Sequence, residues 1–443
     1  MLAVNNTRGQ SESTKDQLQN LLKEGKFNFH ARTYAMGTLN RGELSNYSAV
    51  ATGAGIGYYT PSFYNFRAGM SGFFTFRLYA HNLQESDPVT EGSNRYEIAL
   101  FDMNNPDNQT ELDRLEELFL QYDNDIWLFT LGRQKINTPL LNEQDNRMMS
   151  NIFTGLTGQW RKDQLTIEAG WLTTVSPRGT VNWYNIEESF GVYPFGRSTF
   201  GTPSKYKGNV KSHGIGYAGI RYDSKYVDYQ LWEYYASNVF TISMGQAEAN
   251  LPLSSSTITL GVQGFYQQAL QDGGNADPAK TYILPEDHTY GIGGKAGIEK
   301  GAHGFSLNAL AISKSGRFVF PREWGREIFY ASLPRERYEG NGGLNAVTIK
   351  YRYSPTKRFS TDLGLGNVNT PDIYNTRLNK YGMPSYIHLT GAVDYQFRGW
   401  LNGLEGKFIA VHKIAKERDT LPDTFRINRV DMWNISAIVD YRF

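Results

Sequence analysis

Residues 433–443 read WNISAIVDYRF, and this stretch decides the fold class. Apolar side chains occupy one face of it, and the other face is mostly polar. The residues of the apolar face are Trp433, Ile435, Ala437, Val439, Tyr441 and Phe443. A period of two residues is that of a β-strand with one apolar and one polar face. The chain is therefore expected to end on a strand.

The same alternation recurs through the chain from Lys26 onward, in segments of roughly ten residues. We predict eighteen strands, at 26–40, 45–60, 63–81, 111–123, 125–135, 151–161, 164–174, 211–223, 225–237, 239–250, 256–269, 288–300, 303–314, 343–353, 357–368, 386–397, 401–413 and 431–443. They predict a single β-domain over residues 26–443. The polar segment 1–25 precedes it, in the periplasm or in the lumen.

The connections between these segments alternate in length. Short ones, such as DND and KGA, alternate with mostly long ones, and only the connections near 41–44 and near Ser237 break the long set. The long ones are 82–110, 136–150, 175–210, 270–287, 315–342, 369–385 and 414–430. Consecutive connections of an up-and-down barrel emerge on opposite rims, and outer-membrane barrels have short periplasmic turns and long external loops. The pattern predicts an all-β, antiparallel transmembrane barrel with both termini in the periplasm of a Gram-negative bacterium.

Composition agrees with this class. The mean hydropathy is −0.50, as expected if only alternate residues meet lipid. We find no stretch of about 20 mainly apolar residues that would form a transmembrane helix. The formal net charge of +1 gives no general attraction for nucleic acid, and the absence of Cys excludes disulfides and thiolate metal sites. The histidines have no metal-ligand spacing, so we expect no metal, cofactor or catalytic residues.

Strand parity also predicts which charges face the lumen. If the apolar side chains point outward, the intervening charged residues line a water-filled interior. These predicted wall residues are Arg32, Arg67, Arg77, Lys295, Lys350, Arg352, Asp394, Lys407 and Arg442. Basic side chains spaced along a wall attract anions in steps, and acids among them create a transverse field.

The connection 136–150 is expected to narrow this lumen. A barrel of 16 to 18 strands is wide enough for an aqueous channel, so selection among solutes needs a constriction. The connection holds Pro139 and two leucines that can anchor it to the inner wall, followed by the charged residues Glu143, Asp145 and Arg147. We predict that it folds into the barrel.

The block LGRQKINTPLLNEQDNRMMSNIFTG, residues 131–155, resembles the OprD-type porin family of substrate-specific outer-membrane channels. The terminal Phe443 on an apolar-outward strand also resembles the recognition signal of outer-membrane barrels. The segment RFVFPREWGREIFYASLPRERYEGNG, residues 317–342, is similar to the inward-folding seventh loop of that family. The resemblance runs from about residue 20 to residue 443.

This resemblance implies eighteen strands, a monomer or homotrimer, and a constriction built by the third and seventh loops. It also implies basic residues that guide carboxylate-bearing solutes. Carried over to this sequence, the constriction residues are Arg133, Asp145, Asn146 and Arg147 from the third loop and Arg322, Glu323, Arg326 and Glu327 from the seventh. This chain departs from the family in mixing acids among the bases.

We therefore expect a porin for passive diffusion of small polar, carboxylate-bearing solutes such as amino acids, organic acids and short peptides. The expected surroundings are the lipid bilayer and lipopolysaccharide, with an accessory lipoprotein or surface protein as a further partner. Two alternatives stay open: a barrel hydrolase with a catalytic cluster in its external loops, and a plugged structural or adhesin barrel. Ion conductance or hydrolytic turnover distinguishes them.

Overall fold

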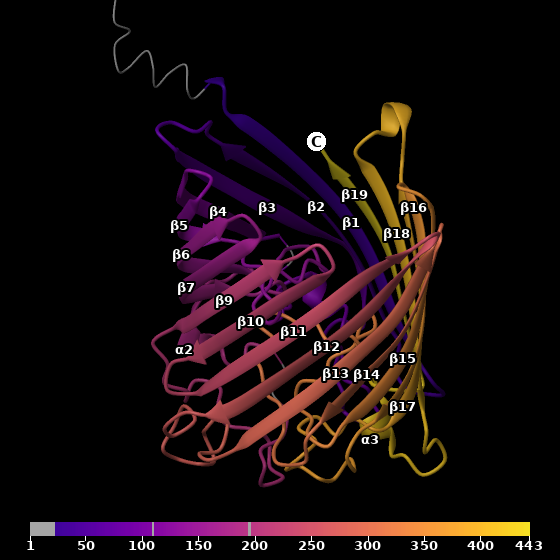
Figure 1. The fold of residues 1–443 in the computed structure, drawn as a ribbon. Helices are drawn as coiled ribbons and strands as arrows, with labels where there is room; N and C mark the ends of the chain where they lie inside the picture. The colour runs from indigo at the N-terminus through magenta and orange to yellow at the C-terminus, as the bar shows by residue number, and fades with distance from the viewer. Residues whose placement is uncertain (1–22, 109, 194–195) are drawn as a thin grey trace, which may run out of the picture.

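Strands make up most of this computed structural model, which describes residues 23–108, 110–193 and 196–443 (Figure 1). The strands are β1 (Lys26–Asn40), β2 (Tyr47–Tyr59), β3 (Phe66–His81), β4 (Leu112–Asp123), β5 (Trp127–Gln134), β6 (Ile152–Lys162), β7 (Leu165–Ser176), β8 (Tyr184–Asn185), β9 (Ile215–Asp223), β10 (Val227–Ala236), β11 (Phe240–Leu253), β12 (Ser256–Ala269), β13 (His288–Lys300), β14 (His303–Ile312), β15 (Asn345–Thr356), β16 (Phe359–Asn369), β17 (Tyr386–Gln396), β18 (Leu404–Ala415) and β19 (Met432–Arg442). The helical turns are η1 (Ile98–Leu100), α2 (Ile186–Ser189), η2 (Gly399–Leu401) and α3 (Asp423–Arg426).

The sheet closes on itself. Each long strand pairs antiparallel with its neighbour in the chain, β7 pairs with β9, and β1 pairs with both β2 and β19. The two-residue strand β8 lies in a loop and pairs only with the end of β7. The other strands form a closed barrel of eighteen, so all eighteen predicted strands are confirmed and the sheet has no free edge.

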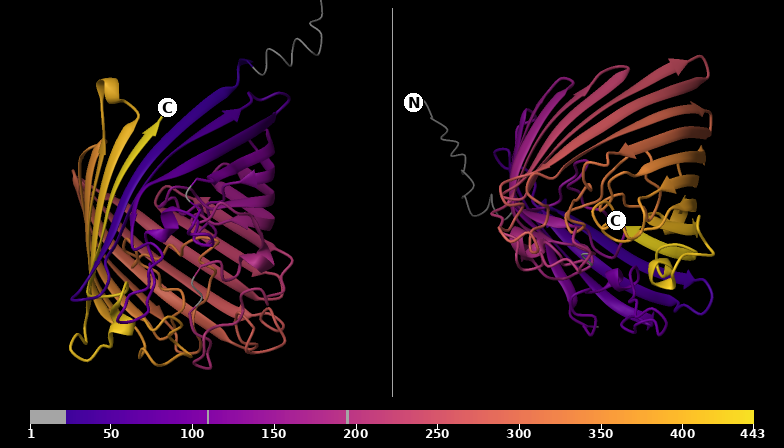
Figure 2. Two further views of the ribbon diagram at one scale, coloured as in Figure 1. Left: turned by 180° about the vertical axis from the view of Figure 1, so that it is seen from behind. Right: turned by 90° about the horizontal axis from the view of Figure 1, so that it is seen from below.

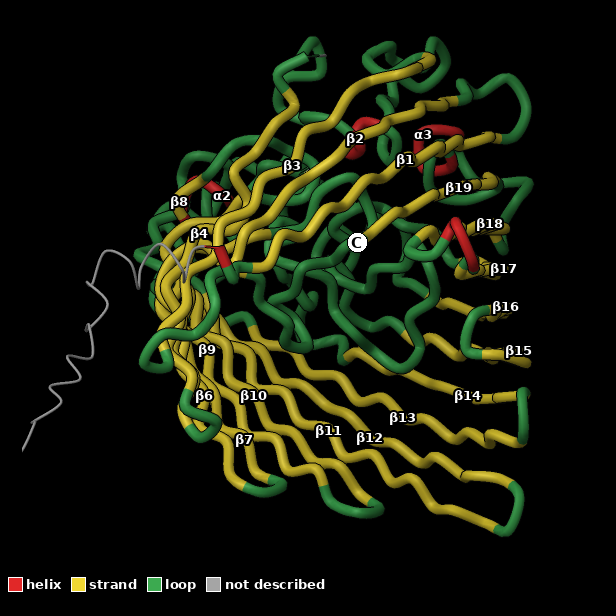
Figure 3. Tube along the Cα trace, turned by 90° about the horizontal axis from the view of Figure 1, so that it is seen from above, coloured by secondary structure: helices red, strands yellow, loops and turns green. Residues whose placement is uncertain are grey.

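The two rims differ as predicted. The start of β1 and the C-terminus lie at one rim, here called the short-turn rim, and the long connections lie at the other (Figures 1 and 2). Seen along the barrel axis, the long connections fold back and fill much of the space within the strands (Figure 3). We number them along the long-loop rim: loop 2 is residues 82–111, loop 3 is 135–151, loop 4 is 177–214, loop 6 is 270–287, loop 7 is 313–344, loop 8 is 370–385 and loop 9 is 416–431.

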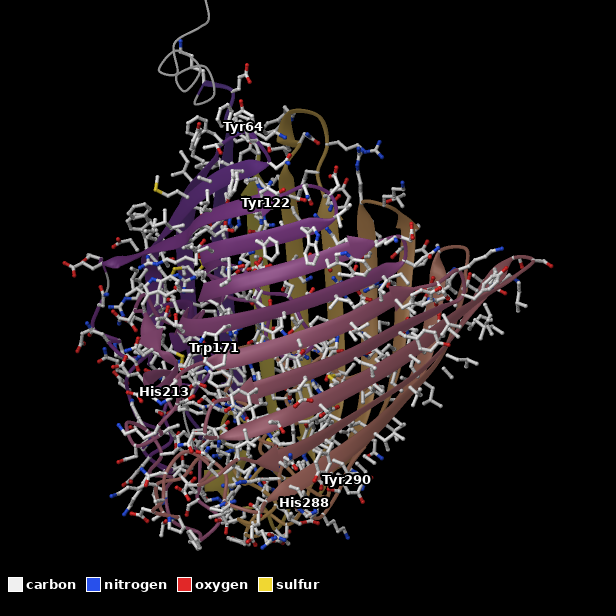
Figure 4. The ribbon with its side chains drawn as sticks, turned by 60° about the vertical axis from the view of Figure 1, so that its left-hand side comes forward. Tyr64, Tyr122, Trp171, His213, His288 and Tyr290 are labelled. Carbon is white, nitrogen blue, oxygen red and sulfur yellow. The ribbon has the colours of Figure 1, made fainter. Side chains whose placement is uncertain are left out.

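The outer face of the barrel is apolar. Leu231, Ile292 and Leu307 expose 63%, 61% and 53% of their surface there, as a lipid-facing side chain must. Tyr64 and Tyr122 lie near the short-turn rim, whereas Trp171 and Tyr290 lie nearer the other, which matches aromatic belts at two interfaces (Figure 4). Among the described residues, no helix is long and apolar enough to cross a membrane.

Glycines on β2 make room for a large side chain that faces inward. β3 carries Phe73 and Phe74 side by side: Phe73 is 2% exposed on the inward face with Thr75, whereas Phe74 is 53% exposed on the outer face. A Cβ at Gly53 or Gly55 would lie within 2.7 Å of the Phe73 ring or of a neighbouring carbonyl oxygen. The GAGIG sequence, residues 53–57, is therefore a packing feature of the strands.

The hydrophobic core lies within the barrel, where loops pack against the inner wall. Its largest fully buried side chain, Trp324 of loop 7, contacts the rings of Phe190 in loop 4 and Phe240 on β11, with centroids 4.9 and 6.2 Å apart. The predicted polar segment 1–25 lies outside the described residues, except for its last three. The core thus fixes the loops that shape the lumen.

Candidate functional site

Loop 3 crosses the lumen between two apolar anchors. Leu140 and Leu141 are buried in the large core cluster beside loop 7, whereas Met148 and Met149 are buried in a second cluster against β1–β3 and loop 2. The Tyr234 hydroxyl of β10 holds the first anchor by donating to Thr138 Oγ1 at 3.0 Å. Because both ends of the loop are fixed, its polar tip, residues 142–147, is held inside the barrel. The leucine anchors and the inward fold agree with the sequence-based expectation.

Loop 7 packs directly on loop 3. The backbone N–H of Asn142 donates to the Trp324 carbonyl at 3.2 Å, and the Asn142 side chain donates to the Arg326 carbonyl at 2.8 Å. Gly325 makes this approach possible: its φ is +156°, and a Cβ there would lie 2.1 Å from the Leu140 carbonyl oxygen. Loops 3 and 7 therefore form one unit across the lumen.

Gly325→Ala should separate the two loops while the barrel stays folded. The new methyl group meets a backbone carbonyl, which cannot move aside as a flexible side chain would. We expect faster cleavage of loops 3 and 7 by added protease, with unchanged heat-modifiable migration of the barrel. Gly42→Ala is the control, because its φ is also positive, at +71°, but nothing lies within 4 Å of the new Cβ. Equal protease resistance in both variants would contradict the packing.

A network of ion pairs attaches the tip of loop 3 to the barrel wall at β1 and β19. Arg32 on β1 binds Asp145 at 2.5 Å and Asp440 on β19 at 2.8 Å, and its Nη1 also donates to the Arg147 carbonyl at 2.5 Å. Arg442 reaches Asp145 at 3.3 Å. Burial alone would raise the pKa of Asp145, but the hydrogen bond and charge of Arg32 outweigh burial and lower it. Asp145 is therefore negatively charged at neutral pH and holds the tip of loop 3 to β1 and β19.

Loop 3 separates two cavities. The turn-side cavity has a volume of about 630 Å³ and is lined by residues near the short-turn rim, among them Lys26 and Arg67, together with Lys135 and Asn137 of loop 3. The acids of this cavity, Glu117 and Glu168, balance part of its positive charge. Its wall is thus of mixed charge.

The loop-side cavity has a volume of about 540 Å³ and is strongly basic. Its lining comes from loops 2, 3, 4, 7, 8 and 9 and from β18. Within the described part of the chain this lining includes nine arginines and two lysines but only three glutamates. Low-dielectric walls focus the field of such a set, so an anion that enters from the long-loop rim is attracted toward loop 3.

Two of these glutamates are already neutralised by fixed partners. Glu336 binds His388 Nδ1 at 2.7 Å and Lys413 at 3.3 Å. Glu339 binds Arg322 at 2.7 Å and Lys380 at 3.5 Å. Both carboxylates are therefore occupied, and the remaining guanidinium groups keep most of their charge for a solute.

The predicted constriction residues separate into three groups. Asn146, Arg147, Arg322 and Arg326 line the loop-side cavity. Glu143 faces the other side and binds Lys135 at 3.1 Å. Glu323 and Glu327 are buried and accept backbone N–H groups, from Tyr193 at 2.8 Å and Tyr338 at 2.5 Å. These two glutamates therefore stabilise the loops. The prediction that they line the pore constriction was wrong.

Arg133 does not lie at the constriction. Its guanidinium stacks on Trp183 of loop 4 at 4.2 Å, and its place on β5 alternates with the inward Gln134 and matches the outward Leu131. Neither cavity includes it in its lining. Arg133 was assigned to the constriction through the family resemblance, whereas the strand period turns its side chain outward.

The predicted wall residues fall into two sets. Those that contact inward loops or line a cavity are Arg32, Arg67, Arg77, Lys295 and Arg442, with Arg77 beside Phe101 of loop 2 and Lys295 beside Tyr330 of loop 7. The others, Lys350, Arg352, Asp394 and Lys407, alternate with exposed apolar residues, and Arg352 pairs with Asp362 and Lys407 with Asp394, each at 2.7 Å. This placement agrees with the predicted parity.

Several basic residues of the loop-side cavity were not predicted. They are Arg95, Arg178, Arg197, Arg335, Arg337, Lys380, Lys413 and Arg429. The sequence carried a signal for two of them, since Arg335 and Arg337 lie in the inward-folding segment 317–342. The described residues include no group of three or more His, Asp or Glu side chains arranged to hold a metal ion.

Comparison with known proteins agrees with this geometry. A family model described as "outer membrane porin, OprD family" matches residues 128–328. No curated protein matches the sequence. The matched range includes loops 3 and 4 and the first half of loop 7, so the resemblance to this family predicted from the sequence is confirmed.

Solved structures of such porins have the same fold. OpdK of Pseudomonas aeruginosa, solved with vanillate, is 15% identical with a TM-score of 0.70. OccAB4 of Acinetobacter baumannii is 13% identical with a TM-score of 0.72, and OccK9 (OpdG) of P. aeruginosa is 11% identical with a TM-score of 0.73. Each comparison covers 96% of this chain and 99% of the other.

Proposed function

We propose that this protein is an outer-membrane channel for passive diffusion of small anionic solutes, chiefly carboxylates such as organic acids and amino acids. The observation that carries the proposal is the loop-side cavity, with its nine arginines and two lysines directly above loop 3. The similarity to OprD-family porins supports the channel, and OpdK, a barrel of the same fold, was solved with vanillate, which is a carboxylate.

The arrangement of charge supports the direction of passage. An anion enters the basic loop-side cavity, passes the tip of loop 3, and reaches the turn-side cavity, where Glu117 and Glu168 weaken its binding. Binding that is strong at entry and weaker at exit allows a solute to leave. In this proposal the long-loop rim is external, the short-turn rim and both termini are periplasmic, and the channel works as a monomer or a homotrimer.

A reversal-potential measurement tests the proposal. The protein reconstituted in a planar bilayer should pass ions, and in a KCl gradient its reversal potential should have the sign of anion preference. Reversing one cavity charge with Arg147→Glu should move that potential toward cations, because Arg147 lines the loop-side cavity at the tip of loop 3. Lys207→Glu, on the exposed surface of loop 4, is the control and should leave it unchanged.

Each outcome assigns a function. A reconstituted barrel that passes no ions would contradict the channel and favour the plugged structural barrel. A cation-selective channel would contradict the proposed solute class. Liposome swelling then ranks solutes: organic acids should enter faster than neutral sugars of the same size, and equal rates would contradict a role for the basic cavity.

A further inference from the structure

Four guanidinium groups converge beside the tip of loop 3. Arg147 comes from loop 3, Arg178 from loop 4, and Arg335 and Arg337 from loop 7, and all four line the loop-side cavity. The Arg178 side chain donates to the Asn146 side chain, and Arg337 donates to Gln144 Oε1 at 2.7 Å. We call these four residues the guanidinium cluster.

The members of the guanidinium cluster affect one another electrostatically. Burial, together with the positive charges of Arg147, Arg337 and Arg335, holds the pKa of Arg178 well below its usual value. Burial and the charge of Arg335 likewise lower the pKa of Arg147 to about 10. The positive charges of the cluster repel one another, so a negative charge that binds among them is stabilised.

The guanidinium cluster lacks the carboxylates that normally accompany buried arginines. In the described ranges, Arg147, Arg178 and Arg335 have no carboxylate within 4 Å, and Arg337 has only Glu327 at 3.7 Å. Their hydrogen bonds go to amides, hydroxyls and carbonyls instead; Arg335, for example, donates to Asn434 at 2.9 Å and to the Tyr34 hydroxyl at 2.8 Å. Buried charges in proteins are ordinarily paired.

Donor groups remain unused as well. Among the residues that the structure describes, the buried Nε atoms of Arg147 and Arg178 have no hydrogen-bond partner. The charge of Glu97 in loop 2 acts on Arg147, but burial raises the pKa of Glu97, and one of its carboxylate oxygens accepts from Thr38 at 2.6 Å. A negatively charged solute that entered the cavity would supply the missing charge.

We propose that the guanidinium cluster prefers compact solutes that carry two or more negative charges, either a phosphate ester or a dicarboxylate, over singly charged solutes of the same size. The inference rests on the proposed function, of which it specifies the solute class. One carboxylate satisfies one planar guanidinium in a bidentate pair and leaves the other cations of the cluster uncompensated. A second negative charge reaches a second guanidinium.

Calorimetric titration of the detergent-purified protein tests this without depending on conduction. Succinate and butyrate have equal chain length but differ by one charge, and glycerol 3-phosphate supplies the phosphate ester. One more charge-assisted pair is expected to lower the Kd by about ten-fold or more. Both doubly charged probes should therefore bind at least about ten-fold more tightly than butyrate. If only one of the two has the lower Kd, the proposal is still supported, and that probe shows whether the preferred solute is a phosphate ester or a dicarboxylate.

Variants locate the effect within the cavity. Arg178→Gln should remove most of the preference for succinate over butyrate, and Arg147→Gln is a second test should the first variant fold poorly. Arg95→Gln removes a charge from the same cavity, but Arg95 acts on Arg429 and stacks on Tyr96, away from the guanidinium cluster. It should keep most of the preference.

The results that overturn the inference are equal Kd values for succinate, glycerol 3-phosphate and butyrate, no measurable binding of any of them, or an equal loss in Arg95→Gln and Arg178→Gln. The last result would mean that the general field of the cavity, and not the guanidinium cluster, sets the preference. Failure of the proposed function looks different: the probes bind with the expected preference, but the reconstituted protein passes no ions.

Discussion

Replacing Trp324 with alanine should widen the channel while the barrel stays intact. The Trp324 side chain is fully buried, packs on Phe190 and Phe240, and donates from Nε1 to Ser189 Oγ at 2.8 Å. Loss of such a side chain costs about 3–5 kcal/mol because a cavity remains. That cost falls on loops 4 and 7 and on the loop 3 residue Asn142, which bonds to the Trp324 carbonyl.

Single-channel recording checks this expectation. The conductance of Trp324→Ala should rise and its anion preference should fall, since loops 3 and 7 no longer hold the basic residues at the constriction. Strand pairing does not involve Trp324, so heat-modifiable migration should be unchanged. Trp400→Ala is the matched control, because Trp400 is 91% exposed at the short-turn rim. A folded Trp324→Ala barrel with native conductance would show that the loop core does not set the pore width.

The strands could be predicted from the sequence because their signal is local. Each strand presents one face to lipid and the other to the lumen, so apolar and polar residues alternate wherever a strand occurs. The prediction placed β1, β12 and β13 at the bounds that the structure shows. Where a strand carries an extra residue, as β4 does between Leu115 and Leu118, the period alone does not give the direction of the next side chain.

The site was predicted less completely because it depends on contacts between loops far apart in the chain. Arg178 and Arg335 meet only after loops 4 and 7 have folded against loop 3, and no local pattern records that meeting. For Glu323 and Glu327 a local pattern was present, but it indicated the wrong role. A carboxylate in an inward loop suggests a pore charge, but these two accept backbone N–H groups of neighbouring loop segments.

The same contacts explain why the acids mixed among the bases do not make the loop-side cavity neutral. Two of its three glutamates are held by specific partners: Glu336 by β17 and β18, and Glu339 by loops 7 and 8. They stabilise the loops that carry the arginines. A nearly neutral chain, with a formal net charge of +1, thereby builds a locally basic cavity.

Glu336→Gln should release loop 7 from the wall and remove a pH dependence that the native protein has. The Glu336 carboxylate accepts from the Tyr386 hydroxyl at 2.5 Å and pairs with His388 and Lys413, so its loss leaves the buried Lys413 without its carboxylate. Breaking one partner of a buried pair costs about 3–5 kcal/mol. Protease cleavage of loop 7 at neutral pH should therefore become faster.

The native protein should show the same release in acid. Burial alone would raise the pKa of Glu336, but the charges of Lys413 and His388 and the hydrogen bonds outweigh burial and lower it to about 2. A carboxylate in an unfolded segment has a pKa of about 4.3, so its stabilisation is complete above that pH and is lost as the pH falls through about 2. Loop 7 cleavage by an acid-stable protease should accordingly accelerate between about pH 4 and pH 2 in the native protein and in Glu286→Gln, an exposed control, but much less in Glu336→Gln. A native profile that is flat over this range would mean that Glu336 does not hold loop 7 in place.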